Sequence, residues 1–380
     1  MKGHQPFFFL AACFAFLEIG VWLVTFETGL LAAGDLPPAQ LHAHEMLFGY
    51  LPAVIAGFLL SSTAGWRVTL LSAAWLAGRV AMTLPAIVPQ ELVAAIDLTF
   101  LPALAIFRLP PLWKSPKWPT IGFAPLLGSL SFANLLWHLD AWGALPGAAR
   151  AGERLAVDLF ILMITVIAGR LVPGYTRAMS IPVNKPKDPG REMASIAIGL
   201  ALLIFDQLGW QAGIGLSALA LGALQLWRLA GWRTVEVLSR PILLVLHMGF
   251  AWLTFGLLLR GIAGLSDWIS EIDAVHAVTI GAIGTLTLGM MGRLTRTHAR
   301  QPAGASPVDI IAYALVVASA LARSILPGLF PDERPAIIVA AGALWMLAFT
   351  LFLVEHGSAL LRRQERKHQI VNRMTGIDDR

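Results

Sequence analysis

Long uninterrupted stretches of apolar residues constrain this chain more than any other feature of its sequence. A membrane-spanning helix needs about 20 predominantly apolar residues. Stretches of this kind cover residues 7–26, 43–63, 68–87, 91–108, 120–137, 152–171, 192–209, 211–229, 241–260, 273–292, 307–326 and 334–356. They do not alternate between apolar and polar residues, so they do not predict a membrane barrel. The sequence therefore predicts an all-α polytopic protein with twelve transmembrane helices, whose main partner is the lipid bilayer.

Composition excludes several other classes of protein. Hydrophobic residues make up 57% of the 380 residues and charged residues only 13%, whereas soluble domains carry about 25% charged residues. The net charge of +5 is spread over short runs, so we expect no nucleic-acid partner. The single cysteine, Cys13, excludes a disulfide framework, a four-cysteine zinc site, an iron–sulfur cluster and covalent haem attachment through CxxCH. We expect one transmembrane domain over residues 1–380, with a short basic tail at 357–380.

The distribution of Lys and Arg sets the expected orientation, because cytoplasmic loops carry an excess of positive charge. The two termini and the even-numbered loops hold 22 of these residues, and the odd-numbered loops hold five. This bias places both termini in the cytoplasm. We therefore expect a multi-pass protein with an even number of spans.

A weak internal repeat accompanies the twelve stretches. Gly57, Gly169 and Gly292 close the second, sixth and tenth stretches, at separations of 112 and 123 residues, which correspond to four spans each time. Such a repeat would divide the chain into three four-helix units. Close packing of small residues at helix ends explains the same glycines without a repeat.

Four of the nine histidines are the strongest candidates for a function: His42, His44, His247 and His276. His42 and His44 lie at the outer mouth of the second span, and His276 lies at the outer mouth of the tenth. Their distances from the repeated glycines place His42 and His276 within about 2 Å in depth. His247 lies about 9 Å into the ninth span from the cytoplasmic side.

These positions are candidates for metal binding, because imidazole is the commonest metal ligand in proteins and a histidine in a membrane span is rare without a function. We expect His42, His44, His247 and His276 to be the principal ligands of a metal or a metal-containing cofactor. The alternative is that each histidine hydrogen-bonds to water and lipid headgroups.

The other histidines and one arginine give weaker signals. His138 is expected in the aromatic belt at the membrane surface, and His298, His356 and His368 are expected in solvent among cytoplasmic basic residues. Arg79 lies within a span and needs an internal anion. Asp97, Asp158 and Asp206 are the candidate carboxylate partners, and a haem propionate is another.

Three blocks of sequence resemble the NnrS family of bacterial membrane proteins. HAHEMLFGY opens a block from His42 to Arg79, GRLVPGYTR spans Gly169 to Arg177, and HAVTIGAIGTLTLGMMGRLTRTHARQP spans His276 to Pro302. LLVLHMGFAWL around His247 fits the family pattern as well. The order and spacing of the blocks extend the resemblance over essentially the whole chain.

The resemblance implies a haem- and copper-containing protein of the inner membrane that is linked to nitric oxide, nitrosative stress and denitrification. The haem would be non-covalent and b-type, nitric oxide would be the small-molecule ligand, and an unknown donor would supply electrons. Twelve helices in three units would also resemble the catalytic subunit of haem–copper oxidases, which is an analogy of fold alone.

Two functions remain open at this point. The first is binding or redox handling of nitric oxide, or protection of iron sites from it, with or without enzymatic turnover. The second is transport or delivery of copper or haem through the same residues. Inverted repeats are typical of transporters, whereas the repeated glycines here all close spans that run inward.

Reporter fusions test the expected topology. A reporter after Arg380 should read cytoplasmic and a reporter in the 138–152 loop should read periplasmic, because the charge bias orients the termini inward. The same side for both fusions would contradict the topology.

Overall fold

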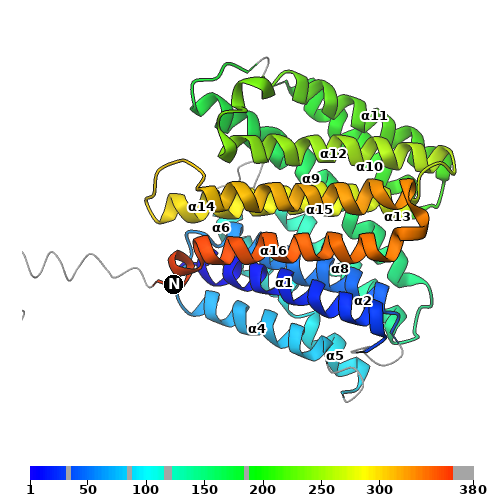
Figure 1. The fold of residues 1–380 in the computed structure, drawn as a ribbon. Helices are drawn as coiled ribbons and strands as arrows, with labels where there is room; N and C mark the ends of the chain where they lie inside the picture. Colours follow the sequence, from blue (N-terminus) through cyan, green and yellow to red (C-terminus); the bar gives the residue numbers. More distant parts are fainter. Residues whose placement is uncertain (31–35, 84–87, 115–121, 184–187, 363–380) are drawn as a thin grey trace, which may run out of the picture.

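The computed structural model describes residues 1–30, 36–83, 88–114, 122–183 and 188–362. Up to residue 178 its elements are α1 (His4–Thr28), α2 (Pro38–His44), η1 (Glu45–Tyr50), α3 (Leu51–Leu59), α4 (Trp66–Met82), α5 (Gln90–Asp97), α6 (Phe100–Lys114), α8 (Phe123–Ala141) and α9 (Ala148–Ala178). They continue as α10 (Pro189–Gln207), α11 (Gln211–Ala230), η2 (Thr234–Val237), α12 (Pro241–Leu265), α13 (Glu271–His276), η3 (Ala277–Gly284), α14 (Thr285–His298), α15 (Pro307–Leu329), η4 (Pro331–Glu333) and α16 (Arg334–Leu361). The long helices lie side by side in one bundle (Figure 1).

The bundle is all-helical and apolar on its outside as well as in its core, as a membrane protein must be. Large side chains such as Ile106, Leu216 and Val354 are more than 60% exposed. Within the described residues, eight helices are long and apolar enough to cross a membrane. They are His4–Thr28, Gln90–Arg108, Ala148–Ala178, Gln211–Ala230, Pro241–Leu265, Glu271–His298, Pro307–Leu329 and Pro331–Leu361.

The remaining four expected spans, 43–63, 68–87, 120–137 and 192–209, are helical over most of their described length. These helices are shorter or more polar than the eight, and the helix over 43–63 carries His44 and Glu45 in its first turns. Residues 84–87 and 120–121 of these expected spans lie outside the described residues, as does 363–380 of the expected tail. The start of that tail is helical, because α16 continues to Leu361.

Several expected loops are partly helical. Helix extends into three of the segments that separate the expected spans: α6 runs to Lys114, α9 runs to Ala178, and η2 forms between α11 and α12. With 31 residues, α9 is about 46 Å long, which exceeds a hydrocarbon core of about 30 Å. A helix satisfies its backbone equally well beyond the bilayer, so the end of an apolar run does not mark the end of the helix.

Two segments of π-helix were not expected from the sequence. η1 follows directly after His44, and η3 follows directly after His276. π-helix is rare and is often found at functional sites. Tyr50 is the last residue of η1, and its hydroxyl lies 2.7 Å from that of Thr287, in the first turn of α14 after η3. This contact joins the two irregular regions.

The two ends of the described chain meet at one end of the bundle. The side chain of Gln5 donates to the carbonyl of Arg362 at 2.7 Å, and the start of α1 lies beside the end of α16 (Figure 1). We call this the N-terminal end. The opposite end, where α2, α5 and α13 begin, we call the α2 end.

The three repeated glycines each leave room for a large side chain of another helix. A Cβ at Gly57 would meet the ring of Phe8, and one at Gly169 would meet the guanidinium of Arg228. At Gly292 the nearest atom is Nε2 of His356, 3.1 Å away. Small-residue packing therefore accounts for all three positions.

A closer backbone contact generates a test of the packing. A Cβ at Gly264 of α12 would lie 2.9 Å from both Cα and N of Gly215 on α11, and backbone atoms cannot rotate away. We expect Gly264→Ala to lower the free energy of unfolding by about 1–3 kcal/mol, as other overpacked contacts do.

Gly174→Ala is the matched control, because Gly174 is helical and a Cβ added there would meet no atom within 4 Å. Alanine there should leave stability unchanged or raise it by up to about 1 kcal/mol. Thermal unfolding in detergent measures both variants. Equal stability of the two would refute the close α11–α12 contact.

Candidate metal centre

A group of buried polar side chains lies near the α2 end, where α2 passes into η1. His44 and Glu45 come from that junction, and the other members come from α4, α5 and α8. All are at least 93% buried. We call them the Arg79 cluster: His44, Glu45, Arg79, Asp97, Asn134 and His138.

Arg79 joins the two carboxylates of this cluster. Its Nη1 donates to Oε1 of Glu45 at 2.5 Å, and its Nη2 donates to Oδ1 of Asp97. Arg79 needed an internal anion, and Asp97 is confirmed as a partner. Asp158 and Asp206 pair with Arg260 instead.

The imidazole of His44 is held at both nitrogens. Nδ1 lies 2.9 Å from Oε1 of Glu45, and Nε2 lies 2.9 Å from Oδ1 of Asn134 and 3.4 Å from Oδ2 of Asp97. The amide of Asn134 in turn donates to Oδ2 of Asp97 at 2.8 Å. The ring therefore has one orientation, with Nε2 directed toward Asp97.

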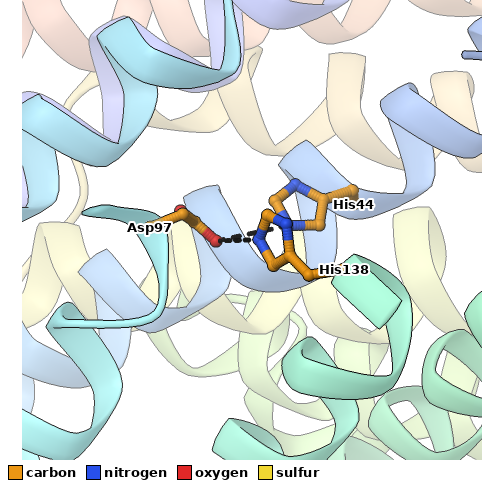
Figure 2. Close-up of side chains that lie close together, drawn as sticks. All are labelled: His44, Asp97 and His138. Atoms are coloured by element: carbon orange, nitrogen blue, oxygen red, sulfur yellow. Dashed lines mark hydrogen bonds and ion pairs between the residues drawn. The ribbon is translucent and has the colours of Figure 1, made fainter. Parts of the chain in front are cut away.

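His138 completes the cluster, and its expected interfacial position is wrong. It is 3% exposed, and its Nε2 lies 3.0 Å from Oδ2 of Asp97. α8 continues to Ala141, which carries His138 into the bundle on the same face as Asn134, one turn earlier. Figure 2 shows the rings of His44 and His138 on one side of the Asp97 carboxylate.

His44, Asp97 and His138 form a ligand set that suits a metal ion. One ligand atom of each lies within 4.8 Å of the other two. Ligand atoms about 2 Å from a metal are about 3–4 Å apart, so a small inward movement would suffice. Glu45 on Nδ1 of His44 is the kind of outer partner that fixes the tautomer of a metal-binding histidine.

The charges of the cluster also favour a cation. Glu45 and Asp97 carry two negative charges against the one positive charge of Arg79, and all three are buried. An uncompensated charge in a low-dielectric interior is costly. A metal ion or a doubly protonated His44 would offset the surplus.

His42 and His276 lie elsewhere at the α2 end. Nδ1 of His42 is 3.4 Å from Oε1 of Glu18, and Nδ1 of His276 donates to the carbonyl of Ile272 at 2.7 Å. Both rings lie within electrostatic range of each other and of Arg323. Among the described residues, Nε2 of neither ring has a hydrogen-bond partner, so both nitrogens are available to a ligand.

His247 is far from these residues along the bundle. It is fully buried near the start of α12, with Nε2 2.9 Å from the hydroxyl of Thr176 and Nδ1 3.0 Å from that of Thr234. Thr176 belongs to the GRLVPGYTR block. The four sequence-predicted ligands therefore occupy three places, and only His44 lies in the Arg79 cluster.

His356 is a further correction, since it was expected in solvent. It is 2% exposed, and its Nε2 lies 2.8 Å from Oδ1 of Asp309. Asp309 also caps the start of α15 in a capping box with Ser306 and accepts from Arg296. His368 lies outside the described residues.

Removing Arg79 tests the charge balance of the cluster. We expect Arg79→Met to lower the free energy of unfolding by about 3–5 kcal/mol, because two buried carboxylates lose their shared partner. Arg67→Met on the same helix is the control. Arg67 is exposed, so its change should stay within about 0.5 kcal/mol. Thermal unfolding in detergent compares the two, and equal melting temperatures would contradict the assigned role.

Comparison with known proteins identifies the family of the chain. No curated protein matches the chain. A family model described as NnrS protein matches residues 1–364. This range includes all three sequence blocks and every member of the Arg79 cluster. The chain therefore belongs to the NnrS family.

Proposed function

We propose that this protein binds haem and copper in the bacterial inner membrane and handles nitric oxide, with copper held by His44, Asp97 and His138. Family membership supports a membrane protein related to nitric oxide. The observation that carries the copper proposal is the group of two imidazoles and one carboxylate, buried beside a surplus negative charge.

Copper suits this ligand set because imidazole nitrogen is a good copper ligand and the site offers two. Iron(II) is the alternative, since two histidines and one carboxylate also bind non-haem iron. In either case Glu45 orients His44, and Asn134 holds the carboxylate of Asp97. The buried walls exclude water from the ligands.

Haem would bind at the mouth, where His42 and His276 lie. Each has Nδ1 held by an acceptor and Nε2 without a described partner, which is the arrangement that iron-binding histidines use. Arg323 supplies positive charge beside both rings and suits the propionates. When bound, haem supplies an iron atom that binds small uncharged ligands such as nitric oxide.

His247 remains a proposed ligand from the sequence. Binding a metal there would replace the contact of one ring nitrogen with Thr176 or Thr234. We therefore rank it below His42, His44 and His276.

The proposed topology has twelve spans in three four-helix units, with both termini in the cytoplasm. The meeting of Gln5 and Arg362 at one end of the bundle supports an even number of crossings. The α2 end would then face the periplasm, where nitric oxide arrives through lipid or water and an electron donor docks.

Delivery of copper or haem is the competing function. A cargo site must release its metal, whereas His44, Asp97 and His138 are 96% buried or more. The burial favours a resident cofactor.

Metal analysis of the purified protein tests the copper site. His44→Gln and His138→Gln should each reduce the copper content more than about 10-fold, because loss of a residue that only hydrogen-bonds to a metal ligand already lowers metal affinity by about that factor. Both variants should leave the haem content unchanged. His356→Gln is the matched control, because His356 is also buried beside an aspartate but lies in another cluster. Full copper in both site variants would refute the centre.

Growth under a nitric oxide donor tests the function. Cells with the wild-type protein should survive better than cells with His44→Gln/His138→Gln or with an empty vector. Equal survival with wild type and the double variant would favour copper or haem delivery instead.

A further inference from the structure

A second buried cluster joins three helices and has no part in the proposed metal sites. Asp158 of α9, Asp206 of α10 and Arg260 of α12 are 2%, 1% and 3% exposed. The arginine uses one nitrogen for each carboxyl group: Nη1 donates to Oδ1 of Asp158, and Nη2 donates to Oδ2 of Asp206 at 2.7 Å. One guanidinium thus holds two carboxyl groups side by side.

The other oxygen of each carboxyl group lacks a donor. Oδ2 of Asp158 and Oδ1 of Asp206 are shielded from solvent and accept no hydrogen bond among the described residues. The shared guanidinium of Arg260 nevertheless holds the two carboxyl groups close to each other. Two ionised carboxylates at this separation repel each other strongly, and one proton between them turns the repulsion into a hydrogen bond.

Charges on the neighbouring helices do not remove the need for a proton between the two carboxyl groups. Nη1 of Arg154, on α9, lies 3.9 Å from Oδ1 of Asp206, which is too long for a hydrogen bond, and its side chain is 29% exposed. The negative charge of Glu271, at the start of α13, attracts the guanidinium of Arg260. The charges of Arg154 and Glu271 have opposite sign and offset each other. The repulsion between the two carboxyl groups therefore decides whether Asp158 and Asp206 share a proton.

The Arg323 cluster at the same end of the bundle provides a contrast. There a single carboxylate, that of Asp273, accepts from Nη1 of Arg323 at 2.7 Å and from Nη2 of Arg334 at 2.8 Å. Two guanidinium groups thus share one oxygen of a single carboxylate. The difference between these clusters lies in the ratio of carboxyl groups to arginines.

We propose that Asp158 and Asp206 bind one proton between them and so form a buried proton-binding site that Arg260 holds in place. The proton supplies a hydrogen bond between the two carboxyl groups. Arg154, one turn away on α9, is partly exposed and adds an ion pair to Oδ1 of Asp206. The site exchanges a proton without any change in the hydrogen bonds of Arg260, and it does not depend on the proposed metal chemistry.

Infrared spectroscopy of the purified protein tests the proposal. A protonated, buried carboxylic acid has a carbonyl stretch above the amide I band that shifts down in D₂O. We expect Asp158→Asn and Asp206→Asn each to remove one such band. Asp273→Asn is the matched control and should keep it. Full retention of the band in both pair variants would overturn the proposal.

Stability supplies a second readout that does not depend on resolving the band. Asparagine has the shape of a protonated aspartic acid, so each single variant keeps one carboxylate for Arg260 and should melt near the wild-type temperature. The double variant leaves Arg260 unpaired and should melt far lower. If each single variant is as unstable as the double variant, both carboxylates are ionised and the proposal is wrong.

Discussion

The pairing of buried arginines with carboxylates of neighbouring helices is the constraint on which this bundle depends. A buried charge without a partner is costly, so each buried arginine must meet a carboxylate inside the bundle. Arg79, Arg260 and Arg323 lie near the ends of α4, α12 and α15, toward the α2 end, and each meets an aspartate from an adjacent helix. These pairs fix how the helices are placed along their axes.

The candidate metal centre follows from one of these pairs. Arg79 holds Glu45 and Asp97 at fixed positions, and those carboxylates in turn orient His44 and His138. His44 and Glu45 both face the cluster, at the point where α2 passes into the π-helix η1. The rigid outer contacts are what a metal site needs, and here they come from the ion pairs that stabilise the fold.

The sequence predicted the helical class, the approximate position of the long helices and the need of Arg79 for an anion, and it singled out His44, which lies in the Arg79 cluster. These depend on local apolar runs and on the cost of buried charge, which a single sequence displays. It did not predict that Asp97 and His138 lie beside His44. The orientation of each helix about its own axis decides which polar residues meet, and a single sequence does not show it. Asn134 and His138, spaced four residues apart on one helical face, were the missed signal. The π-helices and the buried position of His356 have no local sequence signature.

The proposed copper centre requires that His44 and His138 both bind the metal. Electron paramagnetic resonance of the purified protein with copper(II) tests it most directly, because imidazole nitrogens bound to copper split the signal in a way that reports their number. We expect the copper(II) signal to show coupling to two nitrogens in the wild-type protein and to one in His138→Gln. A spectrum unchanged by His138→Gln and by His44→Gln would contradict it.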